Sequence, residues 1–240
     1  MAIKYANLTA AATSLGIVET DTAGDIGTRW LDAWGDVQKA VINSGIGVSS
    51  FTTTVTGTTP TFVPSVTAGE LFTVTTPATE YSGVNSQVTG EILKCEVGKP
   101  FQVRGKFKLS DATQSDFLFG AMITKTDILN TGTSHGINTG NEGVFFCKLD
   151  GATAINAYSY VAGSSTGSAS IGTMDTSAHT YEIEWTGTYV KFYFDSVLKA
   201  SLSASLPTND LSLSINFRAG EAVAKTLTIY PGLAEIQARS

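Results

Sequence analysis

The sequence predicts an all-β protein, an antiparallel sandwich or jelly roll preceded by a short helical N-terminal segment. From Val48 onward, apolar and polar residues alternate with a period of two, and turn signals separate the runs. Before that point, apolar residues recur at helical spacing instead. Many short strands with no helices between them are typical of a sandwich or jelly roll.

The composition is that of a folded chain with an acidic surface. The chain has 240 residues, of which 42% are hydrophobic and 15% are charged, so it can bury a sizeable core. The formal net charge of −6 argues against nucleic acid as the main partner, because neutralising phosphates requires clustered cations. No apolar run approaches the ~18 residues that a membrane span requires, so we expect no membrane partner. The start does not resemble a signal peptide, so we expect synthesis in the cytoplasm.

Residues 1–48 form the predicted helical segment. The stretch GTRWLDAWGDVQKAVINSG places Trp30, Trp34, Val37 and Val41 at helical spacing. Two interpretations are open for this apolar face. It packs on the chain's own sandwich, or it anchors the segment to a neighbouring subunit, since Trp is enriched at interface hot spots. These four residues are therefore the candidate interface residues.

Residues 49–90 are rich in threonine and are interrupted by Pro60, Pro64 and Pro77. Proline cannot donate a hydrogen bond to a strand ladder, so it is confined to edge strands and bulges. We therefore expect edge strands or a surface arm here, and such an arm would let the N-terminal segment reach a neighbour.

Residues 91–240 make up the predicted jelly-roll sandwich. The expected strands are Glu91–Val97, Pro100–Leu109, Asp116–Thr124, Gly143–Leu149, Thr153–Val161, Thr180–Thr186, Tyr189–Asp195, Val197–Leu202, Leu211–Phe217 and Ala222–Tyr230. The glycine-rich stretch VAGSSTGSASIGT predicts a surface loop, because it lacks the Lys-Ser/Thr ending of a phosphate cradle. Cys95 and Cys147 have no metal-ligand spacing. Buried reduced thiols are the favoured interpretation, and a disulfide stays open.

The stretch HTYEIEWTGTYVKFYFD, residues 179–195, predicts a hairpin with a carboxylate pair. Side chains alternate along a strand, so Tyr181 and the apolar residues two and four positions later face the core. Glu182 and Glu184 then share the opposite face, where Lys191 can lie near either of them across the ladder. Retaining glycosidases need two carboxyl groups ~5–5.5 Å apart, a separation that such a pair could reach.

This hairpin resembles that of concanavalin A-like jelly rolls, in which H-x-Y-x-x-x-W precedes a strand ending in Asp-Gly. The chain matches the pattern at His179, Tyr181, Trp185 and Asp195, but has Ser196 where glycine is usual. Glycosidases of this fold carry their catalytic residues in a separate E-x-D-x-E strand, and no such motif occurs here. The resemblance therefore implies a scaffold hairpin, and we expect no enzyme.

Three further blocks extend the resemblance over roughly residues 95–240: PFQVRGKFKLSDATQSDFLFGAMITKTD, EGVFFCKLDGATAINAYSYVAG and LPTNDLSLSINFRAGEAVAKTLTIYPGLAEIQAR. Their order is similar to that of concanavalin A-like virion structural proteins of tailed bacteriophages. This implies a non-enzymatic capsid decoration or cement protein in the virion, with the major capsid protein as partner. It also implies a homo-oligomer, such as a trimer on a local symmetry axis, without a cofactor.

The alternative expectation is a carbohydrate-binding or receptor-binding tail component, which uses a concave, aromatic-lined groove. Its candidate stacking residues are Tyr158, Tyr160, Tyr189 and Tyr193. A calcium ion stays open as a cofactor, since carboxylate and amide oxygens are the ligands it prefers. The candidate oxygen ligands are Asn141, Glu142 and Asp150, with the loop acids Asp111, Asp116, Asp127 and Asp175. Neither His135 nor His179 adjoins a serine or cysteine nucleophile motif, so no catalytic triad is predicted.

Overall fold

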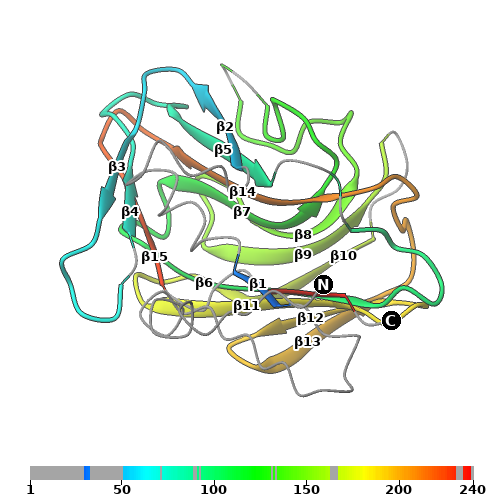
Figure 1. Cartoon of the computed structure of the whole chain (residues 1–240). Helices are drawn as coiled ribbons and strands as arrows, with labels where there is room; N and C mark the ends of the chain where they lie inside the picture. Colours follow the sequence, from blue (N-terminus) through cyan, green and yellow to red (C-terminus); the bar gives the residue numbers. More distant parts are fainter. Residues whose placement is uncertain are drawn as a thin grey trace, which may run out of the picture.

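Two stacked antiparallel β-sheets make up the part of the chain that the computed structural model describes (Figure 1). That part consists of residues 30–32, 51–70, 72–88, 91, 93–130, 132, 134–162, 167–230 and 235–238. The predicted all-β antiparallel sandwich is confirmed. The described residues contain no helix long and apolar enough to cross a membrane.

One sheet has nine strands. Its main order is β13 (Val197–Leu202), β12 (Val190–Phe194), β11 (Ala178–Trp185), β6 (Phe101–Leu109), β15 (Thr226–Ile229), β4 (Phe72–Thr75) and β3 (Thr61–Pro64). Two further strands lie off this path: β16 (Glu235–Ala238) pairs with β6, and β1 (Trp30–Asp32) pairs with β16. Strand β6 is thus central, with β11 on one side and both β15 and β16 on the other.

The second sheet has seven strands. Its order is β10 (Gly167–Thr173), β9 (Ala154–Tyr160), β8 (Gly143–Lys148), β7 (Ser115–Met122), β14 (Ser212–Ala219), β5 (Gly83–Val88) and β2 (Phe51–Thr56). The outermost strands β2 and β3 both come from the proline-interrupted stretch 49–90, and their neighbours β4 and β5 come from it too.

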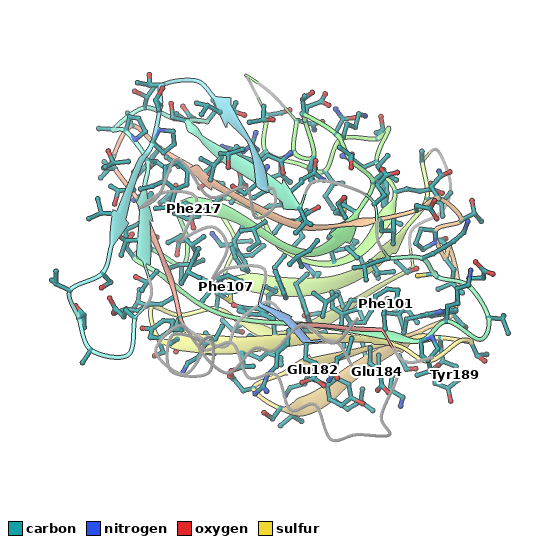
Figure 2. All side chains as sticks on the ribbon, viewed as in Figure 1. Phe101, Phe107, Glu182, Glu184, Tyr189 and Phe217 are labelled. Carbon is teal, nitrogen blue, oxygen red and sulfur yellow. The ribbon has the colours of Figure 1, made fainter. Side chains whose placement is uncertain are left out.

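The core between the sheets follows from strict alternation. In β6, buried and half-buried residues alternate along the whole strand, as the period-two pattern predicts. The rings of Phe107, Phe117 and Tyr181 meet there, with centroids 5.3 to 5.8 Å apart. Figure 2 shows Phe107 between the sheets and the labelled glutamates on the far side of the nine-stranded sheet.

The seven-stranded sheet is covered on its outer face as well. Every residue of β7, β8 and β14 is buried, so these strands have no solvated face. A second apolar cluster joins Leu118 and Phe145 of the sheet to Ile128 and Leu129. The last two belong to residues 123–130, 132 and 134–142, here called the covering segment, which lies over the sheet's outer face.

The predicted helix is wrong at residues 30–32, which are the part of it that the structure describes. Trp30 is the first residue of β1, whose three residues pair with Glu235–Gln237 of β16. The reason is tertiary: β16 extends the edge of β6, and unpaired backbone groups of β16 accept another strand despite the local helical spacing. Trp34, Val37 and Val41 lie outside the described residues.

Two other predictions differ from the structure. Residues Gly167–Thr173, expected in a loop, form β10 with a bulge between Ser170 and Gly172. Small polar residues form a strand here because β9 supplies a full ladder. In the described part of the expected strand Glu91–Val97, pairing is limited to an isolated bridge between Leu93 and Leu211.

Candidate functional site

The predicted carboxylate pair lies on the outer face of the nine-stranded sheet. Glu184 Oε2 accepts hydrogen bonds from Lys191 Nζ at 3.2 Å and from Tyr193 Oη at 3.0 Å. Hydrogen bonding to Glu184 raises the pKa of Lys191, because it favours the charged ammonium. Glu182 Oε2 lies 3.9 Å from Nε of Arg104, which is an ion-pair distance but too long for a hydrogen bond. Each carboxylate therefore faces a cation on a neighbouring strand.

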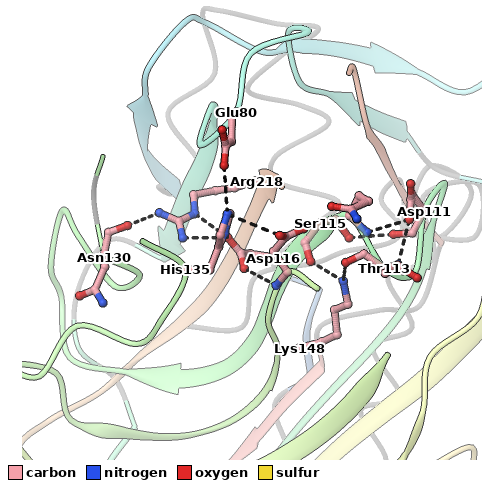
Figure 3. A network of polar contacts seen from close by, with 11 residues as sticks. Glu80, Asp111, Thr113, Ser115, Asp116, Asn130, His135, Lys148 and Arg218 are labelled. Carbon is pink, nitrogen blue, oxygen red and sulfur yellow. Dashed lines mark hydrogen bonds and ion pairs between the residues drawn. The ribbon is translucent and has the colours of Figure 1, made fainter. Parts of the chain in front are cut away.

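A buried polar network crosses the seven-stranded sheet at Asp116 (Figure 3). Asp116 and Arg218 are register partners on β7 and β14, and both side chains are almost completely buried. Arg218 Nε and Nη2 donate to Oδ2 of Asp116 at 3.1 and 2.8 Å. The backbone N–H of Asp150 donates to Oδ1 at 2.8 Å. The carboxylate is thus satisfied by charge-assisted bonds that a buried anion requires.

His135 links the covering segment to this network. Its Nδ1 lies 2.7 Å from Asp116 Oδ2, and its Nε2 faces Asp150 and Glu80 at 3.6 and 3.7 Å. The imidazole also stacks on the ring of Tyr81 at 4.6 Å. Tyr81 has a φ of +64°, a conformation that costs a bulky side chain free energy and that this packing maintains.

Other sheet side chains hold the covering segment in place through its backbone. Gln87 Nε2 donates to the carbonyl of Ile123 at 2.9 Å, and its Oε1 accepts from the N–H of Lys125 at 2.8 Å. Asn85 Nδ2 donates to the carbonyl of Lys125 at 2.7 Å. Arg218 Nη1 donates to the carbonyl of Asn130. The network therefore fastens the chain's own residues onto the outer face of the seven-stranded sheet.

A buried lysine and an ion pair stabilise the turn before β7. Lys148 is buried and donates to the carbonyl of Thr113 at 2.7 Å; burial lowers the pKa of Lys148 to about 8. Asp111 Oδ2 accepts from Lys225 Nζ at 2.7 Å, and Oδ1 accepts from the N–H groups of Thr113 and Gln114. Burial alone would raise the pKa of Asp111, but these hydrogen bonds lower it to about 2.

The candidate calcium ligands are distributed among different structural roles. Asp111, Asp116 and Asp150 belong to the network just described, and Asp127 and Asn141 hydrogen-bond within the covering segment. The remaining candidates are Glu142, which accepts from Asn209, and Asp175, which lies 3.0 Å from His179 Nε2. In the described ranges, no three His, Cys, Asp or Glu side chains form a group that could hold a metal ion.

The four candidate stacking tyrosines lie on different sheets. Tyr158 and Tyr160 extend from β9 on the outer face of the seven-stranded sheet, where Tyr158 stacks on Phe145 at 5.3 Å. Tyr193 lies on β12 of the nine-stranded sheet, and Tyr189, 41% exposed, directly precedes that strand. The set therefore cannot line one groove.

Sequence reasoning missed Arg218, Lys148, Asn130 and Glu80 as network members. The available signal was a charge within a strand that has no other charged residue, such as the arginine of SLSINFRA, because an unpaired charge in a buried strand would be costly. Its partner could not be found from the sequence. Both cysteines are free, and burial raises the pKa of Cys95 to about 12.

No protein-family model matches the chain. No curated protein matches it either. Solved structures do share the fold. The carbohydrate recognition domain of Emp47p is 13% identical at a TM-score of 0.52, over 83% of this chain and 93% of that one. The corresponding Emp46p domain is 9% identical (TM-score 0.50; 79% and 87% covered), and the alginate lyase AlyC3 is 10% identical (0.50; 73% and 80%). The chain thus has a lectin-like, concanavalin A-type sandwich fold.

Proposed function

We propose that the chain is a non-enzymatic structural protein of a tailed-bacteriophage virion, a decoration protein bound to the major capsid protein. The order of sequence blocks over residues 95–240, which is similar to that of phage virion proteins, supports this role. The sandwich acts in this proposal as a rigid body that attaches through its surface, as a homo-oligomer such as a trimer.

The observation that carries the proposal is the covered face of the seven-stranded sheet. A carbohydrate-binding sandwich would use a concave, aromatic-lined groove, which needs an open sheet face. Here β7, β8 and β14 are buried on both faces, and Gln87, Asn85 and Arg218 fasten the covering segment over them. This arrangement favours binding through peripheral surfaces over binding in a groove on this sheet.

The hairpin of β3 and β4 is a suitable attachment surface. Val63 is 48% exposed and Val66 is fully exposed at 103%. Figure 1 shows the loop between these strands projecting beyond the two sheets. Apolar side chains presented on a projecting hairpin have no core to join, and they suit insertion into a neighbouring protein.

The experiment combines virion imaging with shell binding. Cryo-electron microscopy of purified virions should show the sandwich on the outside of the capsid shell. The double variant Val63→Ser/Val66→Ser should bind purified shells roughly tenfold more weakly, a change of ~1.4 kcal/mol. Val97→Ser is the matched control, since Val97 is 82% exposed outside the hairpin, and it should bind as the unmodified chain does. Absence of the chain from the shell density would overturn the proposal.

A further inference from the structure

We infer that strand β2 pairs with the β2 of a second copy of the chain, so that the seven-stranded sheets of two copies join across a two-fold axis. β2 is the last strand of its sheet, and one of its edges pairs with β5 along its whole length. Within the described part of the chain, no strand pairs with its other edge. The resulting dimer goes beyond attachment to a capsid shell, because the chain forms this contact with itself alone.

The other outermost strands are protected against such pairing. An edge strand presents unpaired N–H and C=O groups, and proteins block it with a charge, a proline, a bulge or a very short strand. β13 contains the exposed Lys199, and β10 contains the bulge between Ser170 and Gly172. β3 has four residues and ends in Pro64, and β1 has three residues. Each of these edges therefore discourages the addition of a strand.

β2 has none of these protective features. Its six residues, Phe51–Thr56, read FTTTVT and include no charge and no proline. They pair with β5 in one unbroken register, and Thr53 and Val55 are exposed. Threonine, valine and phenylalanine are the residue types that favour strands. An edge of this kind accepts a strand from another chain, because its unpaired backbone groups are regularly spaced and accessible.

The distribution of charge favours a second copy as the partner. No charged residue lies between Lys39 and Glu70, although 15% of the chain is charged. β2 and β3 come from this stretch, and their neighbours β4 and β5 contain no charged residue either. Figure 1 shows β2 and β3, in cyan, at the ends of the two sheets opposite to β10 and β13. Two copies with a net charge of −6 each repel one another, and contact at an uncharged side keeps their charges apart.

The sequence of β2 is compatible with pairing to itself. Directly opposed residues of an antiparallel pair point to the same face of the sheet. Under a two-fold axis, either Thr53 lies opposite the partner's Thr53, or Thr54 lies opposite the partner's Thr54. The first register also opposes Phe51 to the partner's Val55, and in both registers the remaining pairs consist of threonine and valine. Such aromatic, β-branched and Thr–Thr pairs stabilise a sheet, and no charge meets a like charge.

The test is analytical ultracentrifugation of the full chain over a range of concentrations. We expect a species with twice the mass of one chain that dissociates on dilution. Thr53→Lys should weaken self-association about fivefold, because it brings like charges together across the two-fold axis. Ser170→Lys is the matched control: it places the same charge at an exposed position of β10, the opposite edge of this sheet, and should leave the dimer unchanged. Thr53→Ser keeps the hydroxyl that lies 3.1 Å from Ser86 Oγ and should also dimerise.

A charge exchange separates pairing from folding. Thr53→Glu alone should weaken the dimer as Thr53→Lys does, whereas an equimolar mixture of the two variants should restore it, since opposite charges then meet. Unfolding in urea shows whether each variant is folded. A monomer at every concentration, a dimer that Thr53→Lys leaves intact, or a mixture that associates no better than either variant alone would overturn the inference. Shell binding is measured separately: a monomeric Thr53→Lys chain that still binds shells leaves the proposed function standing, and a dimer that binds no shell leaves the self-pairing of β2 standing.

Discussion

At the residue scale, the pair Asp116 and Arg218 shows how a charge is accommodated inside the sandwich. Both side chains are almost fully buried, and the guanidinium donates two bonds to one carboxylate oxygen. Removing one partner of such a pair leaves an uncompensated buried charge, whereas removing both does not. A substitution of either residue alone should therefore destabilise the protein strongly.

We expect Arg218→Met to lower the free energy of unfolding by about 3–5 kcal/mol, because Asp116 loses its cation in a dry environment. Urea unfolding measures this loss. The double variant Asp116→Leu/Arg218→Met should lose less than the single variant, since no charge is left unpaired. Lys191→Ala is the control at a partly exposed pair and should cost much less than Arg218→Met. Equal losses at both sites would contradict the burial argument.

Asp111 makes the stability of the protein depend on pH in the acid range. Its pKa is lowered from 3.8 to about 2, so its carboxylate contributes stability above the unfolded value, and that contribution is lost as pH falls toward 2. Between pH 5 and 2 we expect the unmodified chain to lose ~1–2 kcal/mol more than Asp111→Asn does. This figure is reduced for solvent screening, because the Asp111 side chain is 30% exposed. Urea titrations at each pH measure it, and parallel curves for both proteins would contradict it.

At the scale of elements, the turn between β12 and β13 is where the chain departs from the jelly-roll pattern, because Ser196 stands where glycine is usual. Asp195 and Ser196 have φ values of +50° and +64°, a tight turn with two left-handed residues. Glycine adopts this conformation without strain, which accounts for the glycine of the related hairpins.

Ser196→Gly should therefore raise the free energy of unfolding by about 0.5–1 kcal/mol, because it relieves left-handed strain. Thermal unfolding measures the change. Ser201→Gly, within β13, is the opposite control: it should destabilise the protein, since glycine weakens a strand. An unchanged or lower stability of Ser196→Gly would contradict the explanation.

The covering segment depends on a few apolar anchors. Leu129 is 2% exposed against the sheet, and the hydrogen bonds of the Asn130 and Asn138 amides close the turn around it. Leu129→Ala should cost ~2–5 kcal/mol as a cavity and should expose both amides to hydrogen exchange. Val97→Ala, at an exposed position, should change neither quantity. Continued protection of both amides in Leu129→Ala would show that the polar contacts suffice to hold the segment.

At the scale of the whole molecule, one core joins the two sheets. Among the residues that the structure describes, its buried members extend from Val74 to Ile229, and β1 pairs with β16 through three residues. Deleting residues 1–48 should therefore leave a cooperative fold, with a loss of ~1–2 kcal/mol or a drop of about 2–8 °C in Tm. Differential scanning calorimetry measures this. A much larger drop would show that residues 1–48 contribute to the core.

Much of the sandwich could be predicted because alternation is a local property. The strands β6, β9, β11 and β12 follow from it, as does the hairpin pairing in which Lys191 reaches Glu184 at 3.2 Å. The prediction failed at β1 and β10, where strand formation depends on a partner strand rather than on the segment's own pattern.

The sequence by itself determined which residues face inward, because the two-residue period of a strand assigns every side chain to one face. It also determined that Glu182 and Glu184 share a surface. Only the tertiary structure decided strand order, the covering of the seven-stranded sheet and the meeting of His135, Asp116 and Arg218. Asp116 and Arg218 lie 102 positions apart in the chain, and Thr75 and Thr226, which join β4 to β15, lie 151 positions apart. Such contacts are stabilised by removing water from groups that are distant in the chain and pairing them with each other. No local sequence pattern encodes this.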